Sequence, residues 1–106
     1  MISERDKKTL DEFAARLRER YPDARVLAFG SRARGDNEAD SDFDICVVMD
    51  TLDRERNEYI SEVLWEVGYE NEVVIGTARF TGEQFDHTLR TVSPLIRTIR
   101  EEGIAA

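Results

Sequence analysis

Apolar residues recur along the first part of the chain at the spacing of one helix face. Between residues 4 and 20 this stripe consists of Leu10, Phe13, Ala14 and Leu17, with Tyr21 directly after it. Ser3 precedes the stretch and, with Asp6 three residues later, resembles a capping box. Tyr21-Pro22-Asp23 then interrupts the pattern. The sequence therefore predicts an amphipathic helix over residues 4–20.

Three shorter apolar stretches predict strands. The first is Arg25–Phe29, which stops at Gly30, and the third is Glu72–Phe80, which is rich in valine and isoleucine. The second, Asp42–Met49, alternates: Phe43, Ile45 and Val47 share one face, and Asp42, Asp44, Cys46 and Val48 share the other. The polar residues 31–41 predict a loop that can hold a short helical turn.

Further helices are predicted in the second half of the chain. One covers residues 53–67, with an apolar face of Ile60, Val63, Leu64 and Val67, and Gly68 ends it. Thr81 caps a short helix that reaches Leu89, and Ser93-Pro94 opens a last helix that Gly103 ends. The order of elements predicts an α/β (α+β) fold, with a small mixed sheet of three or more strands and helices packed on one side.

Length and composition narrow the class of protein. The 106 residues predict a single domain covering residues 1–106. The formal net charge is −8, and because proteins that grip nucleic acid usually carry a basic face, this argues against a polynucleotide substrate. The single cysteine, Cys46, favours a reducing compartment. No apolar run approaches the roughly 20 residues that span a bilayer, so we expect a cytoplasmic protein without membrane contact.

The second predicted strand carries a pair of carboxylates beside a glycine-serine turn. Asp42 and Asp44 point to the same face, with Cα atoms about 6.5 Å apart. Unpaired, they would repel each other and lose hydration, so they require cations. Magnesium suits them, because it takes few protein carboxylates plus substrate phosphates, and two ions can clamp a phosphoryl displacement. The backbone at Gly30-Ser31 and the arginines at 32 and 34 offer a triphosphate cradle.

These residues resemble a known signature. Gly30-Ser31, a spacer and Asp42-Phe43-Asp44 are similar to the motif of the DNA polymerase β-like nucleotidyltransferases. The run at residues 30–36 resembles the form found in minimal nucleotidyltransferases related to kanamycin nucleotidyltransferase, and residues 93–103 are similar to the end of such proteins. The resemblance implies a polymerase β-like nucleotidyltransferase fold. It also implies attack of a hydroxyl on the α-phosphate of a nucleoside triphosphate, transferring AMP from ATP with two Mg²⁺ ions and releasing pyrophosphate.

The same resemblance implies roles for individual residues. Asp42 and Asp44 would be catalytic and hold the metal ions. Gly30 and Ser31 would bind the outer phosphates, with Arg34 assisting them. These positions follow from matching the motif residue by residue.

A third carboxylate, often aspartate, usually lies on the next strand of such proteins. On the matching stretch here we predict Glu72 as the third catalytic and metal-binding residue, because it directly precedes the apolar run, with Glu70 as an alternative ligand. Glutamate departs from the usual pattern, since its extra methylene moves the carboxylate oxygens. A displacement of about 1 Å can cost about a hundredfold in rate, so catalysis could be weakened.

The size of the chain bears on how the acceptor is bound. After the metal site and its supporting helices, too few residues remain for an acceptor-binding domain. Minimal nucleotidyltransferases often pair with HEPN-domain proteins as antitoxin and toxin, and some adenylylate a tyrosine of that partner, which the resemblance implies here. Two alternatives stay open: an antitoxin-like binding module that neutralises its partner by occlusion with weak or no catalysis, and a homodimer that modifies an aminoglycoside-like acceptor.

Other notable side chains have simpler interpretations. Arg32 is expected to solvate its loop, and Cys46 to be a small core residue. His87 has no nearby cysteine or second histidine, so exposure is expected. Trp65 lies off the apolar stripe of its helix and would either pack against a flanking element or mark a contact surface.

Overall fold

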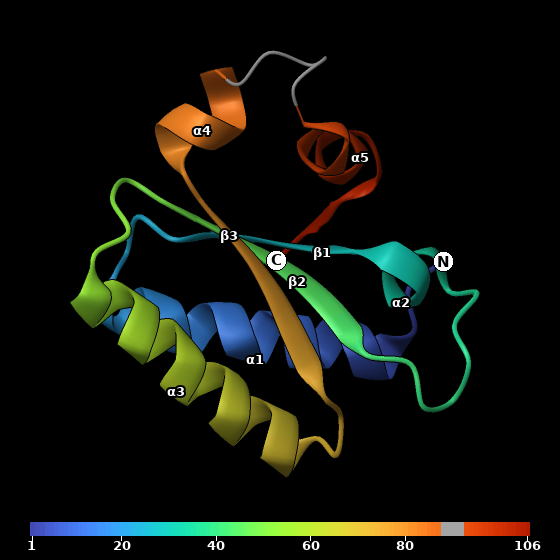
Figure 1. The fold of residues 1–106 in the computed structure, drawn as a ribbon. Coiled ribbons are helices and arrows are strands. Elements are labelled where there is room, and N and C mark those ends of the chain that lie inside the picture. The colour runs from blue at the N-terminus through green and yellow to red at the C-terminus, as the bar shows by residue number, and fades with distance from the viewer. Residues whose placement is uncertain (88–92) are drawn as a thin grey trace.

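The computed structural model describes residues 1–87 and 93–106, which form a four-stranded mixed sheet flanked by helices (Figure 1). In chain order the elements are α1 (Glu4–Arg20), β1 (Arg25–Phe29), α2 (Gly30–Arg34), β2 (Phe43–Met49), α3 (Arg54–Glu70), β3 (Ile75–Thr81), α4 (Gly82–His87), α5 (Pro94–Glu102) and β4 (Ile104–Ala105). The strand order is β3-β2-β1-β4; β2 and β3 run parallel, and the other pairs are antiparallel. The predicted α+β fold with a mixed sheet is confirmed.

Helices lie on both faces of the sheet (Figure 1). The long helices α1 and α3 cover the face of Phe43 and Ile45, where the larger core forms. On the other face, Phe85 of α4 and Ile96 and Ile99 of α5 form a second, smaller core together with Cys46 and Val48 of β2. The expectation that helices pack on one side holds for the long helices only. The reason is that β2 is apolar on both faces over most of its length, so both need cover.

Local capping signals set the helix starts as expected. The Ser3 hydroxyl accepts the Asp6 N–H at 3.0 Å, and the Ser93 hydroxyl accepts that of Ile96 at 3.2 Å. At α4 the Thr81 hydroxyl accepts the N–H of Gln84, whose side-chain oxygen accepts the Thr81 N–H in return. The predicted extension of this helix to Leu89 lies outside the described residues. Among the residues described, no helix is long and apolar enough to cross a membrane.

The end of α3 differs from the prediction. Gly68 does not stop the helix, which continues to Glu70. Instead, a Cβ at Gly68 would lie 2.7 Å from the carbonyl oxygen of Val73, so the glycine lets the returning chain pack closely against the helix. The Val73 N–H also donates to the Gly68 carbonyl at 3.0 Å. The glycine therefore serves a close approach of two backbone segments.

The two outer strands also differ from the prediction. The strand expected from Glu72 begins at Ile75, because Glu72 lies in the turn after α3 with a left-handed φ of 53°. The short strand β4 was not expected. It pairs Ala105 with Leu27 of β1, and the Ala106 N–H donates to the Val26 carbonyl at 3.0 Å. Both features depend on contacts between distant segments.

Candidate active site

The paired carboxylates lie at the beginning of β2, on the sheet face that α4 and α5 cover further along. Asp44 is half-buried and Asp42, just before the strand, is exposed. The predicted alternation is confirmed, since Phe43 and Ile45 lie in the larger core and Cys46 in the smaller one. Burial, and next the negative charge of Asp42, raise the pKa of the Asp44 carboxyl. The negative charge of Asp42 therefore opposes ionisation of Asp44.

The glycine-serine turn lies directly against Asp44. Phe29, the last residue of β1, pairs with Asp44 across the antiparallel ladder, and Gly30 follows with a φ of 76°. A Cβ at Gly30 would overlap the Asp44 Oδ2, so only glycine fits both the conformation and the space. N–H groups in the first turn of a helix have no partner within it, so Gly30 and Ser31 at the start of α2 offer donors beside this carboxylate.

The two arginines of α2 have different surroundings. The Arg34 side chain is 47% exposed, and its Nε donates to the Asp36 Oδ2 at 3.2 Å. Its positive charge partly opposes the rise in the pKa of Asp44, which places it in electrostatic range of that carboxylate. A second surface pair joins the Arg34 Nη1 to the Glu102 Oε2 at 3.8 Å. Exposed ion pairs of this kind contribute little free energy, so Arg34 can turn toward a phosphate at little cost.

The sequence suggested that Arg32 solvates its loop, but the structure places its side chain in a largely buried ion pair. Its side chain is 13% exposed, and its Nη1 contacts the Asp6 Oδ1 of α1 at 3.1 Å. Its Nε donates to the carbonyl of Ser41 at 2.8 Å, directly before Asp42. Arg32 therefore connects α1 and α2 to the loop that leads into the carboxylate pair. No local pattern in the sequence signals a contact between residues 26 positions apart.

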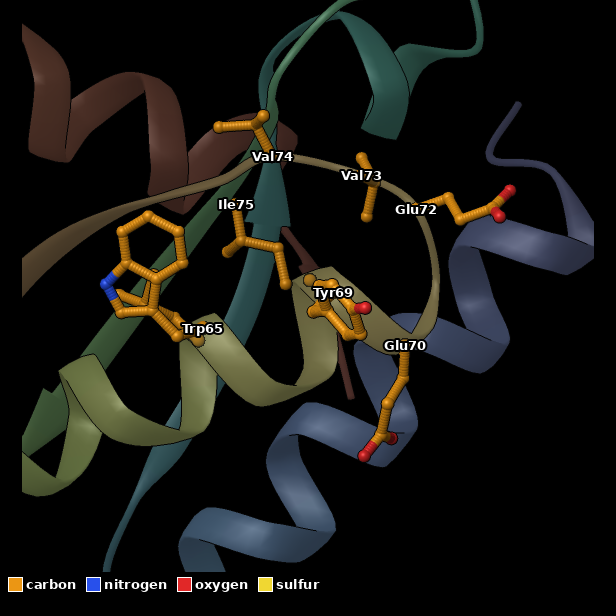
Figure 2. Close-up of a pocket in the computed structure, with 9 residues that line it drawn as sticks. Trp65, Tyr69, Glu70, Glu72, Val73, Val74 and Ile75 are labelled. Carbon is orange, nitrogen blue, oxygen red and sulfur yellow. The ribbon is translucent and has the colours of Figure 1, made fainter.

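The structure does not bring Glu72 or Glu70 to the aspartate pair. Glu72 points toward the beginning of α1 (Figure 2), and Glu70 accepts from the Arg16 Nη2 at 2.7 Å. This hydrogen bond lowers the pKa of Glu70 and commits its carboxylate to joining α1 and α3. Across residues 1–87 and 93–106, no group of three or more acidic, histidine or cysteine side chains could hold one metal ion.

The position on β3 in register with Asp44 is Gly76, which sequence reasoning missed. The available signal was a glycine inside a predicted strand, since such a glycine often marks close approach by a ligand or another chain. The interpretation of Cys46 as a core residue is supported, because it is buried and burial raises the pKa of its thiol to about 12. His87 is exposed as expected.

An apolar groove of about 690 Å³ lies between the last turns of α3 and the approach to β3 (Figure 2). Trp65, Tyr69 and Val74 line it, and they are 74%, 87% and 67% exposed. Of the two interpretations of Trp65, this exposure favours a contact surface. The Val74 carbonyl accepts the N–H of Phe43 at 2.8 Å, so the groove adjoins the end of β2 that carries the carboxylates.

The chain belongs to the nucleotidyltransferase domain family, whose model matches residues 10–105. Its activity class is therefore nucleotidyl transfer, and the resemblance drawn from the sequence is confirmed. Its fold is similar to that of a chain in a crystal structure of a toxin–antitoxin with AMP-PNP. The TM-score is 0.63 at 20% identity, covering 90% of this chain and 69% of that one. No curated protein matches this sequence.

Proposed function

We propose that this protein transfers AMP from ATP to a hydroxyl acceptor, and that the acceptor is a tyrosine of a HEPN-domain toxin partner. The observation that carries the proposal is the placement of Asp44 against the Gly30-Ser31 turn, with Asp42 beside it. A carboxylate pair and a phosphate-binding turn within one strand-loop-strand unit suit a metal-bound triphosphate. Family membership supports the reaction class.

The donor chemistry of this site fits magnesium. The raised pKa of Asp44 means that the ionised pair is unfavourable without a cation, and carboxylate oxygens are the donors that Mg²⁺ prefers. Asp42 and Asp44 would hold the ions. When bound, they would neutralise charge on the triphosphate and on the departing pyrophosphate.

The residues of the chain then have separate tasks in the transfer. The N–H groups of Gly30 and Ser31 bind the outer phosphates, and Arg34 turns from Asp36 to pair with them. The acceptor oxygen forms a bond to the α-phosphorus while the bond from that phosphorus to the bridging oxygen breaks. Pyrophosphate leaves with the electron pair, and the acceptor hydroxyl releases its proton to a base or to water.

The apolar groove supports a protein as the acceptor. A partner bound over Trp65, Tyr69 and Val74 would lie next to the beginning of β2, where the two aspartates are. From there its hydroxyl could reach the α-phosphate. The structurally similar chain comes from a toxin–antitoxin, which motivates a toxin as this partner. Because the reaction consumes ATP, we place the protein in the cytoplasm.

The test uses the purified protein, Mg²⁺, labelled ATP and the HEPN-type product of the neighbouring reading frame. We expect label from [α-³²P]ATP, but not from [γ-³²P]ATP, on a partner tyrosine. Asp42→Asn and Asp44→Asn should each lower labelling by at least about a hundredfold, as expected for loss of a metal ligand. Asp40→Asn, an exposed position in the same loop, is the matched control and should label normally. Absence of label on a partner that binds the wild type would contradict the proposal.

Neutralisation by occlusion is a second candidate, favoured by the absence of a third carboxylate among the residues described. In that case Asp42→Ala and Asp44→Ala would leave neutralisation of the toxin intact, whether or not the wild type labels it. If neutralisation depends on chemistry, labelling and neutralisation are lost together.

A further inference from the structure

Gly76 is the residue of β3 that faces the carboxylate pair. It stands directly opposite Asp44 in the parallel ladder between β2 and β3. A Cβ built on Gly76 would lie 3.8 Å from the Asp44 Oδ1, and apart from its chain neighbours no other atom of the described residues lies within 4 Å of it. A side chain at this position would therefore project onto the sheet surface that carries Asp44.

The backbone does not require glycine there. Only Gly30 and Gly35 have positive φ among the glycines, so Gly76 has a conformation that any L-residue adopts. Glycine inside a strand weakens the strand, because it loses more backbone entropy on folding than other residues and has no side chain that could pack against its neighbours. No backbone lies where its Cβ would be, in contrast to Gly68. What glycine leaves at this position is open space next to Asp44.

The surrounding residues do not fill this space with another ligand. Glu72 lies four residues earlier in a turn, and Glu70 is paired with Arg16. We propose that Gly76 occupies the position of the third metal ligand and leaves it vacant, so that this chain binds a divalent cation only together with the triphosphate. This inference rests on the proposed function.

The physical reason is the number of ligands. Two carboxylates, one of them exposed, give a cation few oxygens and little charge, and Mg²⁺ in such sites completes its shell with substrate phosphates and water. The phosphate oxygens of ATP take the open space over Gly76. An aspartate at 76 would instead add a charged oxygen ligand from the protein itself.

The experiment measures binding of Mn²⁺ to the full chain by the loss of the free-ion electron paramagnetic resonance signal, with and without a non-hydrolysable ATP analogue. The Mn²⁺ that the analogue binds by itself is subtracted by a titration without protein. The wild type should bind Mn²⁺ weakly alone and at least about tenfold more tightly with the analogue. Gly76→Asp should gain at least about tenfold in affinity without nucleotide, because it supplies a third carboxylate. Gly76→Asn, of the same size but uncharged, is the matched control and should show no such gain.

Two results would overturn the inference. One is a Gly76→Asp variant, folded by circular dichroism, that binds Mn²⁺ no better than Gly76→Asn. The other needs no substitution at 76: tight binding of Mn²⁺ by the wild type alone, lost in Glu72→Gln as in Asp44→Asn, would make Glu72 the third ligand. If the wild type binds neither the analogue nor Mn²⁺ in its presence, the proposed function fails instead.

Discussion

At the scale of single residues, the site opposes folding. Asp44 is half-buried beside Asp42, and among the described residues no hydrogen bond reaches its carboxylate. Burial and the charge of Asp42 raise its pKa, and only Arg34 acts against them. Without ligand, an ionised Asp44 is therefore less favourable in the folded chain than in the unfolded one. Binding of cation and triphosphate would offset this cost.

The consequence is a pH-dependent stability difference between the wild type and Asp44→Asn in the absence of metal and nucleotide. A group whose pKa is raised by folding contributes stability below its unfolded pKa, near 4 for aspartate, and that stability is lost as the pH rises through the folded value. Asparagine cannot ionise. As the pH rises from about 3 to about 6, the free energy of unfolding of the variant should therefore increase relative to that of the wild type. The increase should be on the order of 0.5 kcal/mol, because the site is partly exposed. Urea unfolding across this range measures the difference.

Asp40→Asn is the control for this measurement, because Asp40 is exposed in the neighbouring loop. Its stability should follow the wild type across the range. If the stability of Asp44→Asn also equals that of the wild type at every pH, Asp44 ionises in the folded chain without cost. The electrostatic penalty that we assign to the site would then be absent.

At the scale of elements, Arg32 determines where the carboxylate pair lies. It joins α1, α2 and the loop into β2 through the carboxylate of Asp6 and the carbonyls of Ser41 and Ala39, the last at 3.3 Å. Asp6 is only 5% exposed, so this is an ion pair in a protected environment. The loop cannot shift without breaking it, and Asp42 follows the loop directly.

Arg32→Met should destabilise the protein by about 3 kcal/mol, because it leaves the buried Asp6 carboxylate without its partner. Arg32→Lys should lose part of this, since an ammonium cannot reproduce the guanidinium fork. Urea unfolding at pH 7 gives the values. The control is Arg54→Met, whose ion pair with Glu58 is on the surface and should contribute less than about 0.5 kcal/mol. Equal losses in the two methionine variants would refute the role of Arg32, and adding Asp6→Asn to Arg32→Met should restore part of the loss.

The same scale shows what the sequence could and could not predict. The caps at Ser3, Thr81 and Ser93 and the alternation along β2 were predictable, because each depends on residues a few positions apart. The turn at Glu72 was not, since Val and Ile after it indicate a strand while contacts with α3 decide where the strand begins. The vacancy at Gly76 depends on the register of two strands, which the sequence does not contain in readable form.

At the scale of the whole molecule, the sheet separates stability from function. The helices α1 and α3 cover one face, and α4 and α5 lie over the other (Figure 1). This second face is apolar under α4 and α5 and carries Asp42 and Asp44 near the start of β2. The edge strand β3 and the end of α3 add the exposed groove beside that acidic end. The net charge is −8 and the groove is apolar. A partner with an apolar patch surrounded by basic side chains would therefore complement this surface.

Trp65→Ala and Tyr69→Ala test this arrangement. Both side chains are largely exposed, so each substitution should change the free energy of unfolding by no more than about 0.5 kcal/mol. Aromatic anchors at an interface commonly contribute about 2 kcal/mol or more, so binding of the proposed HEPN-type partner in titration calorimetry should weaken by at least about tenfold for one of them. Leu95→Ala, 45% exposed on α5, is the control and should bind normally.

Nucleotide binding distinguishes an effect on this partner surface from an effect on the active site. Trp65 and Tyr69 lie on α3, outside the unit from Gly30 to Asp44 to which phosphate and metal binding are assigned, so binding of Mg²⁺ and the ATP analogue should be unchanged in both variants. Transfer to the partner should then fall only as far as the partner's occupancy falls, and saturating partner should restore it. Normal partner affinity in both variants would place the partner on another face, and the acceptor hydroxyl would have to reach Asp44 across α4 and α5 rather than past β3.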